Sequence, residues 1–252
     1  MRTVDRTKVR VVLVGTEGEA NLGFIVRLCK NFCVDELYLV SPRIDPFSEE
    51  VRRFAAHGSD YLDSGRVVVV STLDEALSGV ALSVCTSAHV GKEGDVLRKA
   101  LDVREAASIA RRYSSVALVF GRESVGLTRE EIARCHVLAH IPANPEYPTL
   151  NLSHAVAIFL YEMFRELSAR SSLDLLDIAT EESIRIADKY IELLAKLVAS
   201  DDRQKKVMSM TMKRMLRISK LTRAELGYVT MMLRRVGRIV EQCLKDKDVN
   251  RL

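Results

Sequence analysis

Residues 115–161 alternate between short apolar runs and polar turns that lead into helices, and this alternation restricts the fold more than any other feature of the chain. The run at residues 116–120 is short and rich in β-branched side chains, which is typical of a buried strand. Residues 128–131 have the spacing of a capping box and predict the start of a short helix. A second strand is expected at residues 137–141 and a strongly apolar helix at residues 152–167. The order of strand, turn, helix, strand, loop and helix is typical of α/β proteins.

The preceding part of the chain repeats the same alternation. Its apolar runs and periodic stretches predict strands at residues 9–14, 37–40, 67–70 and 81–85, and helices at residues 22–32, 48–56 and 97–113, with a further helix beginning at residue 72. Strands that alternate this regularly with helices favour one mostly parallel, doubly wound sheet. In such sheets, ligands bind outside the carboxyl ends of the strands. We therefore expect the functional residues in the turns that follow the strands.

A small, polar linker at residues 168–172 predicts a boundary between a first domain, residues 1–168, and a helical second domain, residues 173–252. Residues 201–252 carry 14 Lys and Arg against 6 Asp and Glu, whereas the net charge of the whole chain is only +4. This concentration of positive charge favours a polyanionic partner, although a solvated helix surface explains the charge equally well. If the partner is RNA, the candidate contacts are Lys205, Lys206, Lys213, Arg214, Arg217, Arg234, Arg235 and Arg238.

Apolar spacing in the second domain predicts which helix faces pack together. Two stripes have helical spacing, one formed by Ile184, Ala187, Ile191, Leu194 and Val198, the other by Leu226, Val229, Leu233, Val236 and Val240. Met208, Met212 and Met215 form a third stripe. Because methionine fills irregular gaps, we expect this third stripe to pack in a core rather than to contact a ligand.

The residues disfavour several classes of protein and site. The glycines within residues 15–23 match neither the phosphate-loop nor the dinucleotide fingerprint. Residues 1–8 lack the apolar core of a signal peptide, and no apolar run is long enough to span a bilayer. The five cysteines are an odd, scattered set, and we expect reduced, mostly buried thiols in a cytoplasmic protein. Cys135, His136 and His140 resemble part of a metal site, but no second ligand pair accompanies them, so we expect no metal.

Three short motifs carry a family resemblance. Residues 118–127, with the sequence LVFGRESVGL, resemble the second signature of the SPOUT-class RNA methyltransferases, and residues 144–156 resemble the third. The first signature, an Asn-x-Gly followed by an Arg, is matched within residues 21–27. The motifs have the order and spacing of the family, and the resemblance covers residues 8–168. Within that class the chain is most similar to the TrmH-like 2′-O-ribose methyltransferases, and among these to the TrmJ-like tRNA enzymes.

The resemblance implies a fold and an assembly that no periodicity argument predicts. Its members have a doubly wound sheet whose C-terminal part is tied in a deep trefoil knot, a rare exception to ordinary chain topology. They also pair as homodimers through the region of the helix at residues 152–167. That helix is apolar almost all round in this sequence, and such a helix needs cover on more than one side.

The resemblance further implies that three loops bind S-adenosylmethionine. The residues carried over are Thr86, Ser87 and Ala88 in the first loop, Gly121 in the second, and Ile141, Pro148, Thr149 and Leu150 in the third. Backbone groups in an apolar pocket suit the recognition of adenine. Taken one at a time, each of these residues is equally well explained as an ordinary turn residue.

The candidate catalytic set implied by the resemblance is Arg27, Asn21, Glu123, Asn151 and Ser153. A guanidinium is effectively always protonated, so a role as general base is physically awkward for Arg27. We expect instead that Arg27 binds the phosphate next to the target ribose and stabilises the developing alkoxide. The polar side chains around it would then hold Arg27 and the loops by hydrogen bonds. Two simpler readings remain, in which Arg27 is a surface charge and Glu123 caps the helix at residues 128–131.

The sequence departs from the family pattern at three places. Residues 17–20 read Glu-Gly-Glu-Ala where members often have Pro and Asn. His89 stands where members often have Arg, and Thr149 where some have Ser. The first two departures concern contacts to the substrate more than contacts to the cofactor.

The function implied is methylation of a tRNA 2′-hydroxyl with S-adenosylmethionine, at a pyrimidine in anticodon-loop position 32. One alternative is a ribosomal RNA methyltransferase of the same fold. Another is a knotted RNA-binding protein without catalysis, which intact candidate catalytic residues disfavour. The basic second domain is expected to dock the RNA, with stabilisation of the dimer as the competing role.

Overall fold

The computed structural model describes residues 7–88, 100–168, 179–219 and 221–249. The chain divides into two compact units, residues 1–170 and 171–252, and each is described here by itself. His89 and the greater part of the predicted linker lie outside the described residues. Among the helices in the described ranges, none is both long enough and apolar enough to cross a membrane.

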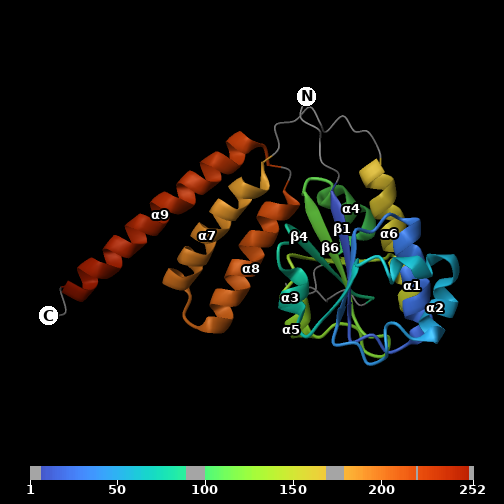
Figure 1. The fold of residues 1–252 in the computed structure, drawn as a ribbon. Helices are drawn as coiled ribbons and strands as arrows, with labels where there is room; N and C mark the ends of the chain where they lie inside the picture. The colour runs from blue at the N-terminus through green and yellow to red at the C-terminus, as the bar shows by residue number, and fades with distance from the viewer. Residues whose placement is uncertain (1–6, 89–99, 169–178, 220, 250–252) are drawn as a thin grey trace. The chain divides into compact units, whose positions relative to one another are not determined.

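The first unit is built on a sheet of seven strands (Figure 1), and its parallel arrangement agrees with the predicted mostly parallel sheet. The strands are β1 (Lys8–Val14), β2 (Glu36–Val40), β3 (Val67–Val70), β4 (Leu82–Thr86), β5 (Leu101–Asp102), β6 (Ser115–Phe120) and β7 (Val137–His140). Their order across the sheet is β3-β2-β1-β6-β4-β7-β5, and every pair of neighbours is parallel. The strands β1, β6 and β4 therefore occupy the centre, where both faces of the sheet are covered.

Helices cover both faces of the sheet. They are α1 (Glu19–Asn31), α2 (Glu49–Ala55), the 3₁₀ helix η1 (Ala56–Tyr61), α3 (Leu73–Leu77), α4 (Val103–Ala110), α5 (Arg129–Ile132) and α6 (Leu152–Ser168). Figure 1 shows α1, α2 and α6 on one side of the strands and α3 and α5 on the other. The helix α6 packs against both α1 and α4, and α1 packs against α2 and η1.

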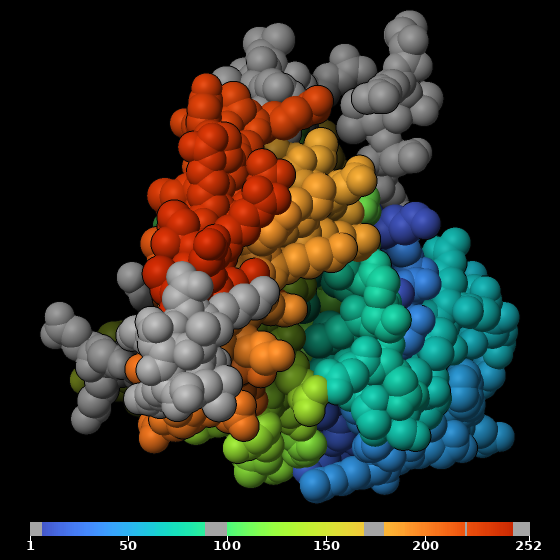
Figure 2. Space-filling view, turned by 90° about the vertical axis from the view of Figure 1, so that its left-hand side faces the viewer, coloured from blue at the N-terminus to red at the C-terminus, as the bar shows by residue number. Residues whose placement is uncertain are grey.

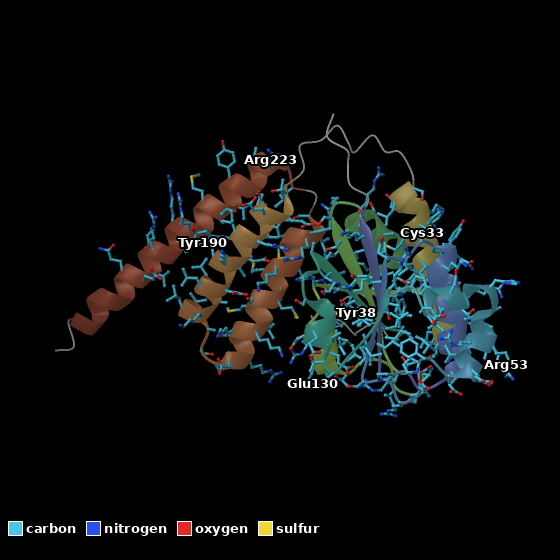
Figure 3. All side chains as sticks on the ribbon, in the orientation of Figure 1. Cys33, Tyr38, Arg53, Glu130, Tyr190 and Arg223 are labelled. Atoms are coloured by element: carbon cyan, nitrogen blue, oxygen red, sulfur yellow. A yellow bond between two sulfur atoms is a disulfide. The ribbon has the colours of Figure 1, made fainter. Side chains whose placement is uncertain are left out.

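Side chains of the central strands are buried on both faces, which explains their continuous apolar runs. Phe120 of β6 points to the α6 side, where its ring meets Phe159 edge to face with the centroids 5.5 Å apart. Val119, the preceding residue, belongs to the cluster under α3 and α5. Tyr38, labelled in Figure 3, packs at the border of that cluster, and the guanidinium of Arg10 lies 4.1 Å from its ring centroid.

Of the helix expected at residues 97–113, residues 97–99 lie outside the described residues, and the rest is α-helical only from Val103 to Ala110. Leu101 and Asp102 form the edge strand β5 beside β7, and α4 begins only at Val103. The Asp102 side chain caps α4, and the side chain of Glu105 completes a capping box. The Asp-x-x-Glu spacing was a sequence signal for this start, whereas pairing with β7 depends on a strand 35 residues further along the chain.

The expectation that all cysteines are reduced is also wrong. Cys85 at the end of β4 and Cys135 before β7 form a disulfide, with Cα atoms 5.8 Å apart. β4 and β7 are neighbours in the sheet, which brings together two residues separated by 50 positions. Cys29 is a buried thiol whose pKa is raised by its burial, and Cys33 and Cys243 are exposed thiols.

The second unit contains three helices within its described residues. They are α7 (Glu181–Val198), α8 (Asp202–Ile218) and α9 (Arg223–Val249). In Figure 2, α9, drawn in red, lies along α7, drawn in light orange, and the two helices pack together. Side chains of Thr180 and Asp201 accept hydrogen bonds from backbone N–H groups at the starts of α7 and α8.

The predicted apolar stripes of this unit are confirmed in part. The buried members are Ile184, Ala187, Ile191, Leu226 and Leu233. Val198 and Val236 are exposed. The expectation that Met208, Met212 and Met215 pack in a core is wrong, since all three side chains are exposed.

Candidate active site

Four turns of the first unit gather at one edge of the sheet. They follow β1, β4, β6 and β7, which are adjacent and parallel. Parallel strands end at the same edge, so the turns at residues 15–18, 86–88, 121–127 and 141–151 lie together at the carboxyl ends, where α/β proteins bind ligands. The three motifs found in the sequence meet at this edge.

Glu123 joins the turn after β6 to the start of α1. Its Oε2 atom accepts a hydrogen bond from the N–H of Glu17 at 3.0 Å, and its Oε1 atom accepts from the N–H of Gly18 at 3.2 Å. The side-chain amide of Asn21 also donates to Oε1, at 3.3 Å. Gly18 is the N-cap of α1 and has no side chain, so a carboxylate from another turn supplies negative charge at this helix end.

This arrangement decides between the two readings of Glu123. The helix α5 has its own capping box, formed by Thr128 and Glu131. Glu123 therefore does not cap α5, and it contacts α1 instead. The structure thus brings Asn21 of the first motif and Glu123 of the second motif into direct contact.

Glu17 is a residue of this site that the sequence reasoning missed. Its Oε2 atom accepts from the backbone N–H of Ser124 at 3.1 Å, and its Oε1 atom accepts from the Ser124 hydroxyl at 3.0 Å. Arg43 donates to the same Oε1 atom at 2.6 Å. The hydroxyl of Ser124 and, to a smaller extent, the nearby guanidinium of Arg43 hold the pKa of Glu17 below its usual range. Only the position of Glu17, in a turn at a strand end, was available in the sequence as a signal.

Arg122 is part of the scaffold of the turn after β6. Its guanidinium forms two hydrogen bonds with the carboxylate of Glu131, at 3.1 and 3.0 Å, in the bidentate geometry that favours Arg–carboxylate pairs. Its aliphatic part lies over Gly15, where a Cβ atom would come within 3.0 Å of the Arg122 Cγ atom. The turns after β1 and β6 are therefore in direct contact beneath the site.

The backbone of this turn folds back on itself at Gly121. A Cβ atom at Gly121 would lie 2.1 Å from the carbonyl carbon of Gly126 and 2.3 Å from the nitrogen of Leu127. Arg122 and Gly126 form an antiparallel bridge that closes the turn. Only glycine permits this close approach of two backbone segments.

We expect the substitution Gly121→Ala to lower the free energy of unfolding by about 1–3 kcal/mol, because the added methyl group must displace backbone atoms. Chemical denaturation of the variant and of the wild type measures the difference. Gly227→Ala is the matched control, since a Cβ atom at Gly227 meets nothing within 4 Å and its helix α9 favours alanine. A Gly121→Ala variant as stable as the wild type would contradict the close approach.

The first and third predicted cofactor loops lie at the ends of β4 and β7. The hydroxyl of Thr86 donates to the carbonyl of Val119 at 3.0 Å, and the N–H of Ser87 donates to the carbonyl of Ala139 at 3.1 Å. These bonds hold the end of β4 between its neighbours β6 and β7. In the remaining set, Ala88, Ile141, Pro148 and Leu150 are half-buried and Thr149 is exposed.

Arg27 lies on α1 with its side chain exposed. Within the part of the chain that the structure describes, its guanidinium forms no ion pair, so the charge is available to a ligand. The backbone of η1 lies against α1 at this point, because a Cβ atom at Gly58 would come within 2.9 Å of the Arg27 Cα atom. The backbones of α1 and η1 are therefore in close contact near Arg27.

Asn151 and Ser153 contact each other at the start of α6. The Oδ1 atom of Asn151 accepts from the N–H of Ser153 at 2.9 Å and from its hydroxyl at 2.7 Å. This geometry is that of an N-terminal cap. The structure gives both residues a role in starting α6, beside the loop at residues 141–151.

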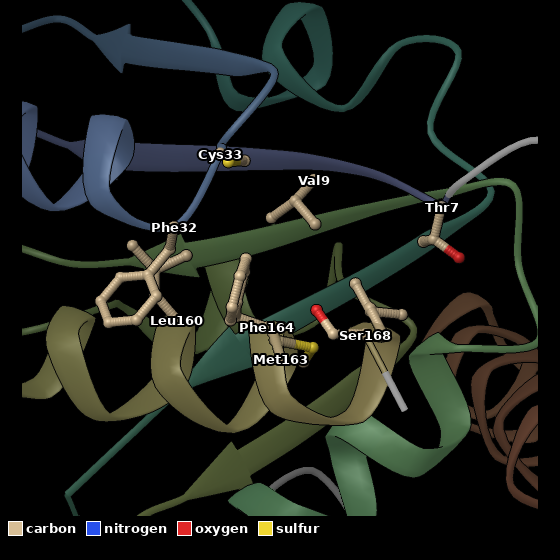
Figure 4. Close-up of a pocket in the computed structure, with 9 residues that line it drawn as sticks. Thr7, Val9, Phe32, Cys33, Leu160, Met163, Phe164 and Ser168 are labelled. Carbon is tan, nitrogen blue, oxygen red and sulfur yellow. The ribbon is translucent and has the colours of Figure 1, made fainter. Parts of the chain in front are cut away.

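A separate apolar pocket lies at the opposite edge of the sheet (Figure 4). Its lining includes Val9 near the amino end of β1, Phe32 after α1, and Leu160 and Phe164 on α6. These positions are at the amino ends of the strands, away from the four turns. This pocket is therefore not part of the candidate active site.

The predicted RNA contacts of the second unit fall into two groups. Arg217 is only 4% exposed, and its guanidinium forms hydrogen bonds with the carboxylate of Asp188 at 3.0 and 2.6 Å. Arg214 is buried as well, and Lys213 pairs with Glu192. Burial and the Arg217–Asp188 pair make Arg214 and Arg217 the weakest candidates of the set, and their contact with RNA stays a prediction. The exposed cations of the set are Lys205, Lys206, Arg234, Arg235 and Arg238.

Comparisons with known proteins point to one family. The sequence model of the SpoU rRNA Methylase family matches residues 8–161. The chain is 40% identical over 208 residues to the tRNA (cytidine-2′-O-)-methyltransferase TrmJ of Sulfolobus acidocaldarius, with 82% of this chain and 84% of that protein covered. It is 42% identical over 158 residues to the tRNA (cytidine/uridine-2′-O-)-methyltransferase TrmJ of Yersinia pestis, with 62% of this chain and 59% of that protein covered. The match thus spans less than two thirds of the Yersinia protein.

Solved structures agree with this relationship. The crystal structure of an AdoMet-bound rRNA methyltransferase from Sinorhizobium meliloti is 28% identical to this chain, with a TM-score of 0.53. The alignment covers 65% of this chain and 58% of that chain. The matched family segment, residues 8–161, contains the whole candidate active site.

Proposed function

The chain belongs to the SpoU rRNA methylase family, and from this membership we propose that it transfers a methyl group from S-adenosylmethionine to a ribose 2′-hydroxyl of tRNA. The single observation that carries the substrate class is the 40% identity, over most of both chains, to a tRNA cytidine 2′-O-methyltransferase. The finer part of the proposal is the target, a pyrimidine at position 32 of the anticodon loop. A tRNA substrate also implies a cytoplasmic location.

The residues at the carboxyl edge suit S-adenosylmethionine. Half-buried apolar side chains at Ala88, Ile141 and Leu150 offer cover for an adenine ring, and backbone groups of the adjoining turns offer hydrogen bonds. Bound S-adenosylmethionine would supply the methyl group from its positively charged sulfonium, and the leaving group would be the neutral thioether S-adenosylhomocysteine. The candidate cofactor contacts remain those of the three loops, at residues 86–88, 121 and 141–150.

The protein's own contribution is positioning and charge. The 2′-hydroxyl loses a proton as its oxygen takes the methyl group, so negative charge develops on that oxygen. We assign Arg27 to the phosphate beside the target ribose and to this oxygen, because its guanidinium is exposed and forms no ion pair with a described residue. Asn21 and Glu123 hold the start of α1, and Asn151 with Ser153 holds the start of α6. Alignment of the reacting groups is the main source of rate acceleration in such a displacement.

The finer fold proposal is the trefoil knot. The chain leaves β4 for the far edge at β5, returns to β6 beside β1, and then inserts β7 between β4 and β5. The helix α6 comes back against α1 and α4. This path supports a knot in which residues 141–168 pass through a loop of the preceding chain. An experimental trace in which this segment passes through no loop would contradict it.

A homodimer is the proposed assembly. Tyr161 and Phe164 of α6 are 53% and 42% exposed, and Phe164 meets Phe32 at the pocket of Figure 4. A second copy of the chain would cover these side chains, in line with a helix α6 that is apolar almost all round. Light scattering that gives the mass of a single chain at micromolar concentration would contradict this pairing.

The function is tested by methyl transfer to defined RNAs. We expect the purified protein with S-adenosylmethionine to form one 2′-O-methylated pyrimidine in a tRNA transcript and none in the same tRNA with a 2′-deoxy nucleotide at position 32. Mass spectrometry of the digested RNA measures the product. Methylation of ribosomal RNA fragments but not of tRNA would support the alternative substrate of the family, and no transfer to either RNA would contradict the function. Calorimetry separates these outcomes from a failure to bind S-adenosylmethionine.

A further inference from the structure

Glu17 occupies a junction between three turns at the carboxyl edge of the sheet. It lies in the turn after β1 and binds Ser124 in the turn after β6. Its second partner, Arg43, comes from the turn after β2, where the N–H of Arg43 also donates to the carbonyl of Thr16 at 2.9 Å. The Glu17 side chain is 22% exposed, and its bonds to Ser124 and Arg43 lie at the surface of the unit.

The contacts between the turns after β1 and β6 are reciprocal. Glu123 accepts from the backbone N–H groups of Glu17 and Gly18, and Glu17 accepts from the backbone N–H and the hydroxyl of Ser124. We call these four residues the carboxylate clasp. Each turn thus gives a charged acceptor to the backbone of the other, and such charge-assisted bonds are stronger than neutral ones.

The clasp connects two parts of the proposed active site. On one side is α1, which carries Asn21 and Arg27. On the other side is the turn that begins at Gly121, a candidate part of the cofactor site. A helix is rigid over the roughly two turns between the start of α1 and Arg27. A displacement at the start of α1 is therefore transmitted to Arg27.

We propose that Glu17 is a positioning residue that sets Arg27 of α1 against the turn after β6 during methyl transfer. This inference rests on the proposed function and deepens it. Glu17 touches no reacting group, and its effect is exerted through Arg27. It also gives a role to Glu17, the first of residues 17–20, where the sequence departs from the pattern of similar proteins.

The fold of α1 does not depend on Glu17. The helix packs closely against α2 and η1. A Cβ atom at Gly23 of α1 would lie 2.6 Å from the carbonyl oxygen of Val51 in α2, and a Cβ atom at Gly58 of η1 would lie 2.9 Å from the Cα atom of Arg27 in α1. Loss of the clasp is therefore expected to change the placement of the helix start and not its existence. The lowered pKa of Glu17 keeps its carboxylate charged at neutral pH, and this charge is lost only as the pH falls through that lowered value, below the usual 4.5.

The substitution Glu17→Gln tests the proposal. A glutamine has one oxygen acceptor, so it cannot serve both donors of Ser124 and Arg43 as the carboxylate does. We expect kcat for tRNA methylation to fall about tenfold, as small misplacements of catalytic groups do, while KM for S-adenosylmethionine stays within about twofold. The matched control is Glu19→Gln, which changes a carboxylate two residues away that binds Ser48 and not the clasp.

A second background separates positioning from general structural damage. In the variant Arg27→Lys, which keeps the charge but not the planar fork, the further change Glu17→Gln is expected to lower kcat by less than about twofold. Three results would overturn the proposal. Glu17→Gln could lower kcat tenfold in both backgrounds, Glu19→Gln could lower kcat as well, or Glu17→Gln could leave kcat unchanged. If Glu17→Gln does not fold, Ser124→Ala replaces it, because it removes the hydroxyl donor alone. If the wild-type protein transfers no methyl group to tRNA, the proposed function itself is wrong. This result differs from one in which the wild type is active and Glu17→Gln has the same kcat, which contradicts only the role of Glu17.

Discussion

Replacement of Arg27 by alanine is expected to lower methyl transfer to tRNA by about 10²–10³-fold, the usual effect of removing one donor that stabilises charge in a transition state. The affinity for S-adenosylmethionine should not change, because Arg27 lies on the exposed side of α1 and not in the three loops assigned to the cofactor. Single-turnover rates with tRNA, together with calorimetry for the cofactor, measure the two quantities separately.

Lys30→Ala is the matched control for Arg27→Ala. Lys30 lies one turn later on the same helix, and its ammonium group pairs with Asp60 at 2.8 Å. We expect its removal to leave the rate within about twofold, since exposed ion pairs contribute little. If Arg27→Ala retains more than a third of the wild-type rate, the residue is a surface charge and the assignment is wrong.

Removal of residues 171–252 is expected to abolish most tRNA binding and turnover and to leave the cofactor affinity intact. The five exposed cations proposed to contact RNA belong to the second unit, whereas the candidate cofactor loops all belong to the first unit. Phosphate contacts position an RNA without reading its bases, so the second unit should set affinity and the first unit the reaction. Filter binding over a range of salt concentrations measures the affinity, and calorimetry measures cofactor binding.

The full-length chain permits a sharper form of this test. The variant to test has alanine in place of all five exposed cations, which are Lys205, Lys206, Arg234, Arg235 and Arg238. Each phosphate contact that is lost should reduce the slope of log K against log salt by about 0.7–0.9. The control replaces Arg52 and Lys30, which pair with Asp63 and Asp60 in the first unit, and should leave the slope unchanged. Unchanged tRNA affinity and slope in the truncated chain would mean that the second unit stabilises the dimer and does not dock RNA.

Features that depend on near neighbours in the chain were predictable from the sequence. The strand at residues 116–120 and the capping box at residues 128–131 appear in the structure at the expected positions. Apolar runs and caps act within a few residues, so their patterns remain readable in the linear chain. The order of the three motifs can also be read along the chain. This order sufficed to identify the family, which the comparisons confirmed.

Features that depend on the order of strands in the sheet were not predictable. Glu17 and Ser124 are separated by 107 positions, and Cys85 and Cys135 by 50, and each pair meets only because its strands are neighbours. The chemistry of one residue does not reveal which distant group will form a bond with its side chain. The charge of Arg217 likewise predicts a surface residue until Asp188 of α7 is placed beside it. The linear pattern therefore specified which elements form and what chemistry they carry, whereas the partner of each charged group depended on the three-dimensional packing of those elements.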